Sequence, residues 1–214
     1  MPATPLVLVP SESPTSPRVR LEEALRTHTA DLAACDTADL LHRALTAAPE
    51  QATYAVLREL VVHDAAARTF QAPEYGFLAS RFLAEQLREQ VASHGILTFS
   101  DAIQHANAAG LLGPELVALV GRHREALDAA LRHERDQRYS WFGLKTLADR
   151  YLLRHPTSRV PLETPQMFLM RVAAGVSDTL QETLDLYEAF STHRFLPSSP
   201  TLFNAGTARP QLSS

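Results

Sequence analysis

The amino-acid sequence predicts a mainly α-helical protein that ends in a short extended segment. Three observations predict this fold class. Apolar residues recur at helical spacing from Arg18 to His193, capping residues and prolines precede several of these runs, and strand-like patterns are confined to short pieces near the end. Hydrophobic residues make up 45% of the 214 residues, which is enough apolar side chain to bury a core.

Composition and charge exclude several classes of protein. The formal net charge of -4 argues against a free-standing nucleic-acid binder. The single cysteine, Cys35, excludes a disulfide framework and a multi-cysteine metal site, and it indicates a reducing compartment. The sequence has no apolar run of about 18 residues and no secretory signal at its start. We therefore expect a cytoplasmic protein with neither a nucleic-acid nor a membrane partner.

The helices are predicted from apolar spacing and from the residues that begin and end each run. Ser, Thr and Asp accept hydrogen bonds from free N–H groups at a helix start, proline fits the first turn, and glycine ends a helix. Residues 1–17 are rich in proline and serine and are expected to form a flexible leader. In chain order, helices are expected over 21–32, from a cap at Asp36 to Pro49, over 54–61, over 73–87, from a cap at Ser100 to Gly110, over 114–127, from a cap at Thr164 to Gly175, and from a cap at Ser177 to Phe190.

The last twenty residues differ from the helical body. Residues 195–201 are expected to be extended and residues 204–207 to form a turn. This stretch gathers hydroxyl groups and small residues, which allow close backbone approach and suit a phosphate or a sugar. An ordinary loop rich in serine and proline is the alternative interpretation of the same composition.

The other polar clusters are expected to be structural. No histidine pair has the spacing of a zinc site, so no metal-ligating residue is predicted. No catalytic or cofactor-binding residue is predicted in this chain either. Cys35 is expected in a helical region as a packed thiol, with a reactive thiol as the alternative. Solvated helix faces are expected to carry His63–Asp64 and His133–Glu134. A solvated or ion-paired face is expected to carry Arg132, Arg135 and Arg138. The core is expected to contain Met167, Phe168 and Met170.

Four motifs over residues 135–214 resemble the ribonucleotide reductase large subunit. Residues 199–214, SPTLFNAGTARPQLSS, are similar to the segment that enters the catalytic barrel of that family. Residues 139–147 (YSWFGLKTL), 149–154 (DRYLLR) and 163–173 (ETPQMFLMRVA) agree with the family in order and spacing. The resemblance implies a helical reductase N-terminal domain over 106–198 and the first strand of an α/β barrel over 199–214.

Residues 18–105 resemble, more weakly, the ATP-cone module that precedes this domain in many family members. The best local match is PEYGFLASRF at residues 73–82. The basic strand and Gly-Arg turn that open a cone are replaced here by the leader. Leu57 follows Thr53 by four residues, where the family has an acid. We therefore expect a degenerate, helical cone that binds ATP and dATP weakly or not at all.

The resemblance implies reduction of ribonucleotides to deoxyribonucleotides by radical chemistry, with a thioredoxin-type dithiol as reductant. It implies that Ser199 and Ser214 contact the substrate and that Thr201 lies beside them. The family's radical and redox cysteines fall outside the matched residues, so the chain is expected to be inactive alone. Packing or barrel support is the implied role of Trp141, Phe142, Lys145 and Arg171.

The implied partners are the remainder of the barrel, a nucleotide substrate and, in the whole enzyme, ATP or dNTP effectors. The radical would come from a metal-containing small subunit in class I or from adenosylcobalamin in class II. A non-catalytic module for regulation or subunit association is the alternative function. The match stops just before a cysteine of the family. Protein splicing needs a nucleophilic residue at that position, and a cysteine supplies one. We therefore expect an intein-interrupted or split gene, with a simple fragment as the alternative.

Overall fold

The computed structural model describes residues 16–212, which form ten α-helices and one 3-10 helix. They divide into two compact units, one that ends at Tyr75 and one that begins at Gly76. The predicted leader lies outside the described residues, except that Ser16 and Pro17 begin the first helix. Among the described residues, no helix is both long and apolar enough to cross a membrane.

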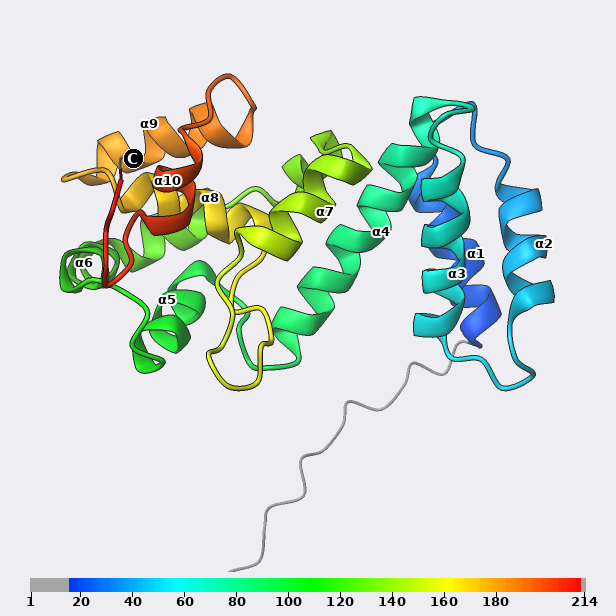
Figure 1. The fold of residues 1–214 in the computed structure, drawn as a ribbon, viewed down its shortest axis with the longest axis horizontal. Coiled ribbons are helices and arrows are strands. Elements are labelled where there is room, and N and C mark those ends of the chain that lie inside the picture. Colours follow the sequence, from blue (N-terminus) through cyan, green and yellow to red (C-terminus); the bar gives the residue numbers. More distant parts are fainter. Residues whose placement is uncertain (1–15, 213–214) are drawn as a thin grey trace, which may run out of the picture. The chain divides into compact units, whose positions relative to one another are not determined.

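Unit 1 contains helices α1 (Pro17–His28), α2 (Thr37–Ala47) and α3 (Tyr54–Ala67), which pack against one another (Figure 1). The predicted cap at Asp36 is confirmed: its side chain accepts a hydrogen bond from a backbone N–H group in the first turn of α2, and the Thr53 side chain caps α3 in the same way. The apolar faces meet in a core of buried side chains, among them Leu21, Leu25, Leu40, Leu57 and Val61.

Cys35 corrects one prediction in unit 1. It is half-buried in the loop between α1 and α2, and not in a helix, and its N–H donates to the carbonyl of Leu32. The reason is local, because the Asp36 side chain caps α2 and fixes its start one residue later.

Unit 2 contains the remaining helices, and the boundary between the units falls inside α4. In chain order they are α4 (Pro73–Ala92), α5 (Phe99–Ala108), α6 (Pro114–Ala130), the 3-10 helix η1 (His133–Arg138), α7 (Trp141–Arg150), α8 (Pro165–Ala174), α9 (Leu180–Ser191) and α10 (Ser199–Asn204).

Two predicted caps in unit 2 are wrong by two residues. The capping residues are Thr98 for α5 and Thr179 for α9, where Ser100 and Ser177 were expected. Each threonine has an acidic residue three positions later and forms a reciprocal capping box with it. The displaced serines bond elsewhere: the Ser100 N–H donates to Asp128, and the Ser177 hydroxyl donates to the carbonyl of Ala173.

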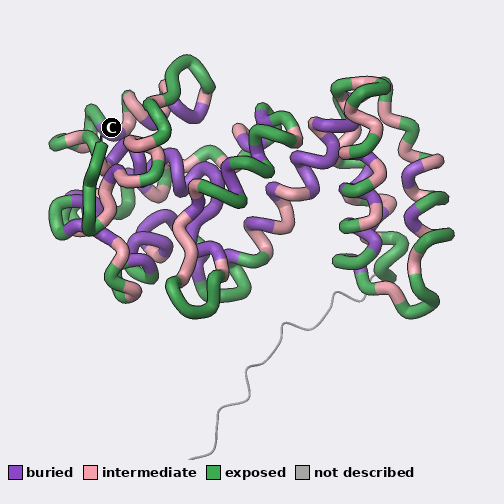
Figure 2. The backbone as a smooth tube through the Cα atoms, in the orientation of Figure 1, coloured by how far each residue is buried: buried purple, intermediate pink, exposed green. Residues whose placement is uncertain are grey.

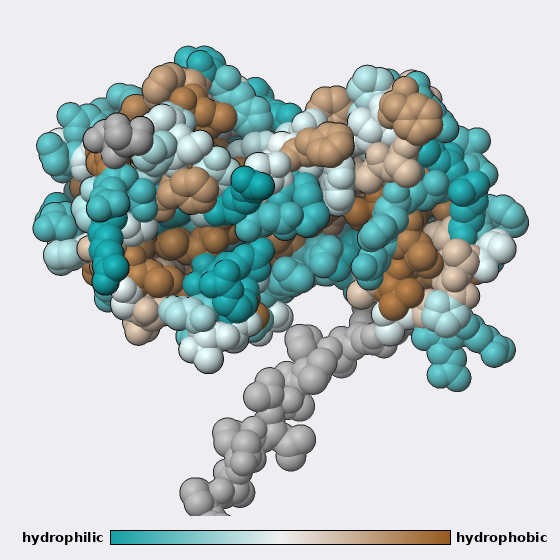
Figure 3. Space-filling model, viewed as in Figure 1, coloured by the Kyte–Doolittle hydropathy of each residue, from teal (hydrophilic) through white to brown (hydrophobic). Residues whose placement is uncertain are grey.

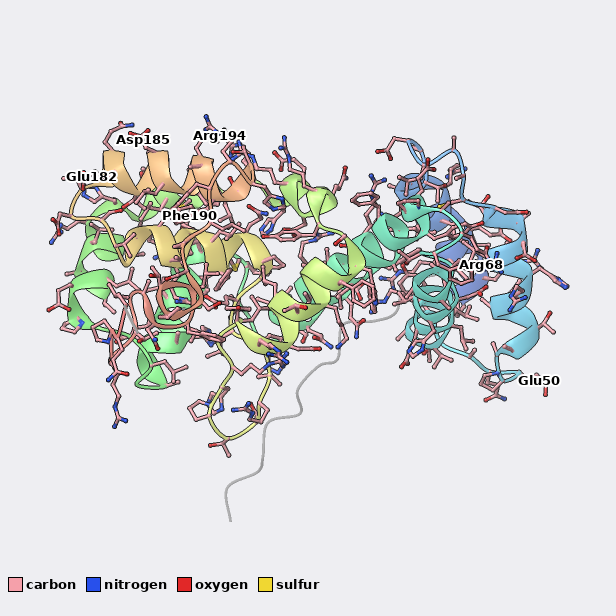
Figure 4. The ribbon with its side chains drawn as sticks, turned by 45° about the horizontal axis from the view of Figure 1, so that its top comes forward. Glu50, Arg68, Glu182, Asp185, Phe190 and Arg194 are labelled. Carbon is pink, nitrogen blue, oxygen red and sulfur yellow. The ribbon has the colours of Figure 1, made fainter. Side chains whose placement is uncertain are left out.

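Helix α8 is the centre of unit 2. All ten of its residues are buried, and Figure 2 shows the helix as buried along its length. The predicted start at Thr164 and end at Gly175 are confirmed. Helix α9 packs along α8; in Figure 4, Phe190 lies on the side of α9 toward α8, whereas Asp185 lies on the opposite side.

A buried polar junction joins η1 to the helices around it. The Asp136 carboxylate accepts hydrogen bonds from Gln166 at 2.9 Å and from Arg88 at 3.2 Å, and the Tyr187 hydroxyl donates to Gln166 at 2.8 Å. Burial raises the pKa of Asp136 to about 6, despite these donors. On the surface, Arg135 pairs with Glu188 at 2.7 Å, which confirms an ion-paired face for this arginine.

The predicted barrel strand is not formed within the described residues. Residues 195–198 are extended, but Ser199–Asn204 is the short helix α10, and residues 16–212 contain only two isolated β-bridges. Pro200 fits the first helical turn, and a strand needs a neighbouring strand to satisfy its backbone groups. The predicted turn after Asn204 is confirmed: Gly206 has a φ of +73°, and the Thr207 N–H donates to the Asn204 carbonyl at 3.0 Å.

Candidate functional site

The candidate site is the segment of residues 199–212, where α10 is followed by a turn and by irregular chain that is bonded back to α10. The returning chain is held to α10 by two side chains of that helix. The Thr201 hydroxyl donates to the Leu212 carbonyl at 3.1 Å, and the Asn204 amide donates to the Gln211 carbonyl at 2.8 Å. The segment therefore folds back on itself and presents α10 on the surface of unit 2.

The turn at Ala205–Gly206 is bonded to the body of unit 2. The Gly113 N–H, before α6, donates to the Gly206 carbonyl at 3.0 Å, and the Ala208 N–H donates to the Leu111 carbonyl at 2.9 Å. The Ala205 side chain is fully buried. These bonds fix the backbone after the last residue of α10, whereas Ser199 is the first residue of that helix.

A close backbone approach accompanies these bonds. Gly175, which caps α8, lies so near the turn that an added Cβ would be 2.5 Å from the Ala205 carbonyl carbon and would overlap the Gly206 nitrogen. Gly175 has right-handed helical angles (φ -76°, ψ -9°), so the glycine is required by lack of space and not by an unusual φ.

A buried ion pair is hydrogen-bonded to the turn through the Ala205 carbonyl. Arg171 of α8 donates to the Glu163 carboxylate through Nε at 2.9 Å and through Nη2 at 3.0 Å, and it donates to the Ala205 carbonyl through Nη1 at 2.8 Å. Arg171 is 0% exposed and Glu163 is 3% exposed. Glu163 also accepts the Leu153 N–H at 2.8 Å, so both partners are bonded to backbone beyond the pair.

The structure brings two of the three predicted substrate residues together. Ser199 and Thr201 both lie in α10, and Ser199 is exposed with its Oγ 3.1 Å from the Tyr151 hydroxyl. The Thr201 hydroxyl is engaged by the Leu212 carbonyl, as described above. Ser214 lies outside the described residues.

Four residues were predicted as packing or barrel support. Trp141 is half-buried, and the other three divide into two groups. Arg171 is buried, which confirms its structural role. Phe142 is 72% exposed, and Lys145 pairs with Asp149 on the surface at 2.7 Å, so neither packs inside unit 2. Phe142 borders an apolar groove of about 400 Å³ between α7, α8 and α10, and Figure 3 shows apolar surface on the face of unit 2 that carries α10.

Sequence reasoning did not identify Tyr151 or Glu163 as site residues, although both lie in the quoted motifs. Within residues 16–212, the structure shows no group of three or more His, Cys, Asp or Glu side chains that could hold a metal ion. The arrangement offers an exposed hydroxyl on a helix whose following turn is bonded to a buried arginine, and the sequence of unit 2 contains no cysteine.

Comparison with known proteins agrees with the motifs. Residues 137–210 match the model of the ribonucleotide reductase all-alpha domain. The chain is 34% identical over 186 residues to the ribonucleoside-diphosphate reductase large subunit of Arabidopsis thaliana, an alignment that covers 84% of this chain and 22% of that protein. It is 32% identical over 189 residues to the ribonucleoside-diphosphate reductase large chain of Schizosaccharomyces pombe, an alignment that covers 84% of this chain and 23% of that protein.

A third relative is the ribonucleoside-diphosphate reductase large chain of Neurospora crassa, which is 35% identical over 168 residues, covering 76% of this chain and 18% of that protein. The chain thus spans about a fifth of the length of these curated relatives. It belongs to the ribonucleotide reductase large-subunit family and corresponds to the N-terminal portion of that subunit.

Proposed function

We propose that this chain provides the substrate-contacting N-terminal part of a ribonucleotide reductase large subunit. In this role it contributes to the reduction of ribonucleotides to deoxyribonucleotides, and the remainder of the subunit supplies the catalytic barrel. Ser199 contacts a substrate phosphate, Thr201 lies beside that contact, and Ser214 contributes a second hydroxyl. The exposed apolar groove beside Phe142 is consistent with association, because a partner surface would cover it.

The fixed position of the Ser199 hydroxyl is the observation that carries the proposal. Phosphate oxygens accept hydrogen bonds, so a protein hydroxyl must donate to them. Ser199 is exposed, and either oxygen can be the donor in its bond to Tyr151, so its proton is available to a phosphate, whereas the Thr201 hydroxyl already donates to Leu212. The turn after α10 is anchored by a hydrogen bond from buried Arg171. The backbone that carries Ser199 is therefore already ordered, and binding a phosphate would not have to offset the entropy lost in ordering it.

Reductase chemistry requires groups that this chain does not contain. Its one cysteine, Cys35, lies in the loop between α1 and α2 of unit 1, whereas a thiyl radical and a reducing dithiol need three thiols. We therefore propose that the chain has no turnover alone. The radical would come from a partner, either a metal-containing small subunit or adenosylcobalamin.

Reconstitution tests this function. The chain is combined with the remaining large-subunit sequence and a radical source, and deoxyribonucleotide formation is measured from ribonucleoside diphosphates and triphosphates. We expect turnover only in the complete mixture. Within it, Ser199→Ala is expected to raise KM by about ten-fold or more, because a hydrogen bond to a charged group contributes about 1.5–3 kcal/mol.

Ser198→Ala is the matched control, since Ser198 precedes α10 without capping it through its side chain. This variant should keep the wild-type KM. Turnover by the chain alone, or equal KM values for wild type and Ser199→Ala, would contradict the proposal. A complete mixture without turnover would instead favour a non-catalytic module for subunit association.

We also propose that residues 18–105 are a cone whose effector site is degraded. The Thr53 hydroxyl is used to cap α3, where it accepts from the Val56 N–H at 3.4 Å, and Leu57 is a core residue that is 3% exposed. No acid is therefore available four residues after the threonine. Calorimetric titration of the chain with ATP or dATP should give no saturable heat, and binding with a micromolar Kd would disprove this assignment.

A further inference from the structure

Tyr151 makes contacts with both ends of α10. Its hydroxyl lies 3.1 Å from Ser199 Oγ at the first residue of the helix, and its ring stacks on Phe203, with ring centroids 4.3 Å apart and an interplanar angle of 15°. Ser199 and Phe203 are four residues apart, so they lie on one face of the helix. Tyr151 therefore covers that face with a single side chain.

Tyr151 is itself held in place. Its N–H caps α7 by donating to the Leu147 carbonyl at 2.9 Å, and its ring also lies against the fully buried Phe168, with centroids 6.2 Å apart. The hydroxyl thus lies beside Ser199 on a ring that is held by stacking on Phe203 and by a tilted contact with Phe168. Such a group can select one rotamer of a serine hydroxyl that would otherwise rotate in solvent.

We propose that Tyr151 is a positioning residue that orients the Ser199 hydroxyl toward a substrate phosphate; this inference rests on the proposed function. The direction of the hydrogen bonds follows from the chemistry of the groups. A phosphate oxygen only accepts, so Ser199 donates to it, and Ser199 Oγ is then left to accept from Tyr151. The Tyr151 bond fixes the serine rotamer and strengthens its donation, because successive hydrogen bonds polarise one another.

Tyr151→Phe separates this role from packing, because it removes the hydroxyl and keeps the stacked ring. In the reconstituted reductase we expect it to raise KM for the nucleotide about three- to ten-fold with kcat little changed, the effect of losing a neutral hydrogen bond that acts on binding. In a Ser199→Ala background the same change is expected to have no further effect, since Tyr151 acts through that serine.

Tyr139→Phe is the matched control. Tyr139 borders the same groove, and its buried hydroxyl has no hydrogen-bond partner among the described residues, so its removal should leave KM unchanged. Hydrogen exchange of the chain alone gives a second readout. Amide protection of residues 199–204 should survive Tyr151→Phe and fall in Tyr151→Ala, which also removes the stacking on Phe203.

The outcomes separate this inference from the function on which it rests. If Ser199→Ala raises KM and Tyr151→Phe does not, Tyr151 has no positioning role and the proposed function stands. An equal rise from Tyr151→Phe in both backgrounds, or loss of α10 protection in Tyr151→Phe, would show a purely structural role and overturn the inference. If Ser199→Ala leaves KM unchanged, or if no mixture turns over, the proposed function fails and the inference fails with it.

Discussion

Arg171→Met is expected to lower the free energy of unfolding of unit 2 by about 3–5 kcal/mol, because it leaves the Glu163 carboxylate buried without its partner. The same change removes the donor to the Ala205 carbonyl, so the turn after α10 should lose protection in hydrogen exchange. Urea unfolding followed by fluorescence measures the effect directly, because the single tryptophan, Trp141, lies in α7 of unit 2.

Lys145→Met is the matched control, since it makes the same kind of replacement in an exposed pair. Lys145 and Asp149 are 46% and 51% exposed at a distance of 2.7 Å, and such pairs contribute less than about 1 kcal/mol. A Glu163→Gln, Arg171→Met double variant should lose less stability than the two single changes combined, because no unpaired charge remains. If Arg171→Met and Lys145→Met unfold at the same urea concentration, the buried pair does not anchor the site.

The helices of this protein could be predicted from sequence because their signals are local. Thr164 and Pro165 begin α8 and Gly175 ends it, all within one short stretch of chain. The two displaced caps show the limit of local signals. Ser100 and Ser177 are good capping residues, but the acids Asp101 and Glu182 each select the threonine three positions before them as the cap.

The candidate site was predictable only in part, because contacts between distant residues build it. The motif drew attention to Ser199, but the Tyr151 hydroxyl that meets it is 48 residues away, and Arg171 and Ala205 are 34 residues apart. The same limit explains the incorrect strand. Pro200 fits the first turn of a helix, and a strand depends on a neighbour that no local pattern in residues 195–204 can indicate.

Gly175→Ala is expected to destabilise unit 2 by about 3 kcal/mol, at the upper end of the range for overpacking. The added methyl group would meet the backbone of Ala205 and Gly206, which cannot rotate aside as a flexible side chain would. The turn itself is bonded to Arg171 and to Gly113, so relief of the overlap requires breaking at least one of those bonds. Urea unfolding followed by Trp141 fluorescence measures the loss, and reconstitution should show a raised KM because Ser199 moves with α10.

Gly121→Ala is the matched control, and we expect this glycine-to-alanine change not to destabilise unit 2. Gly121 is exposed in α6, and a Cβ there would have no heavy atom within 4 Å. Alanine is favoured over glycine in a helix by about 1 kcal/mol, so this variant should be as stable as the wild type or more stable. If both variants were equally stable, the backbone approach of Gly175 to the turn would not constrain the site. A loss confined to Gly175→Ala would instead show that α8 sets the position of α10 through backbone contact as well as through the charge of Arg171.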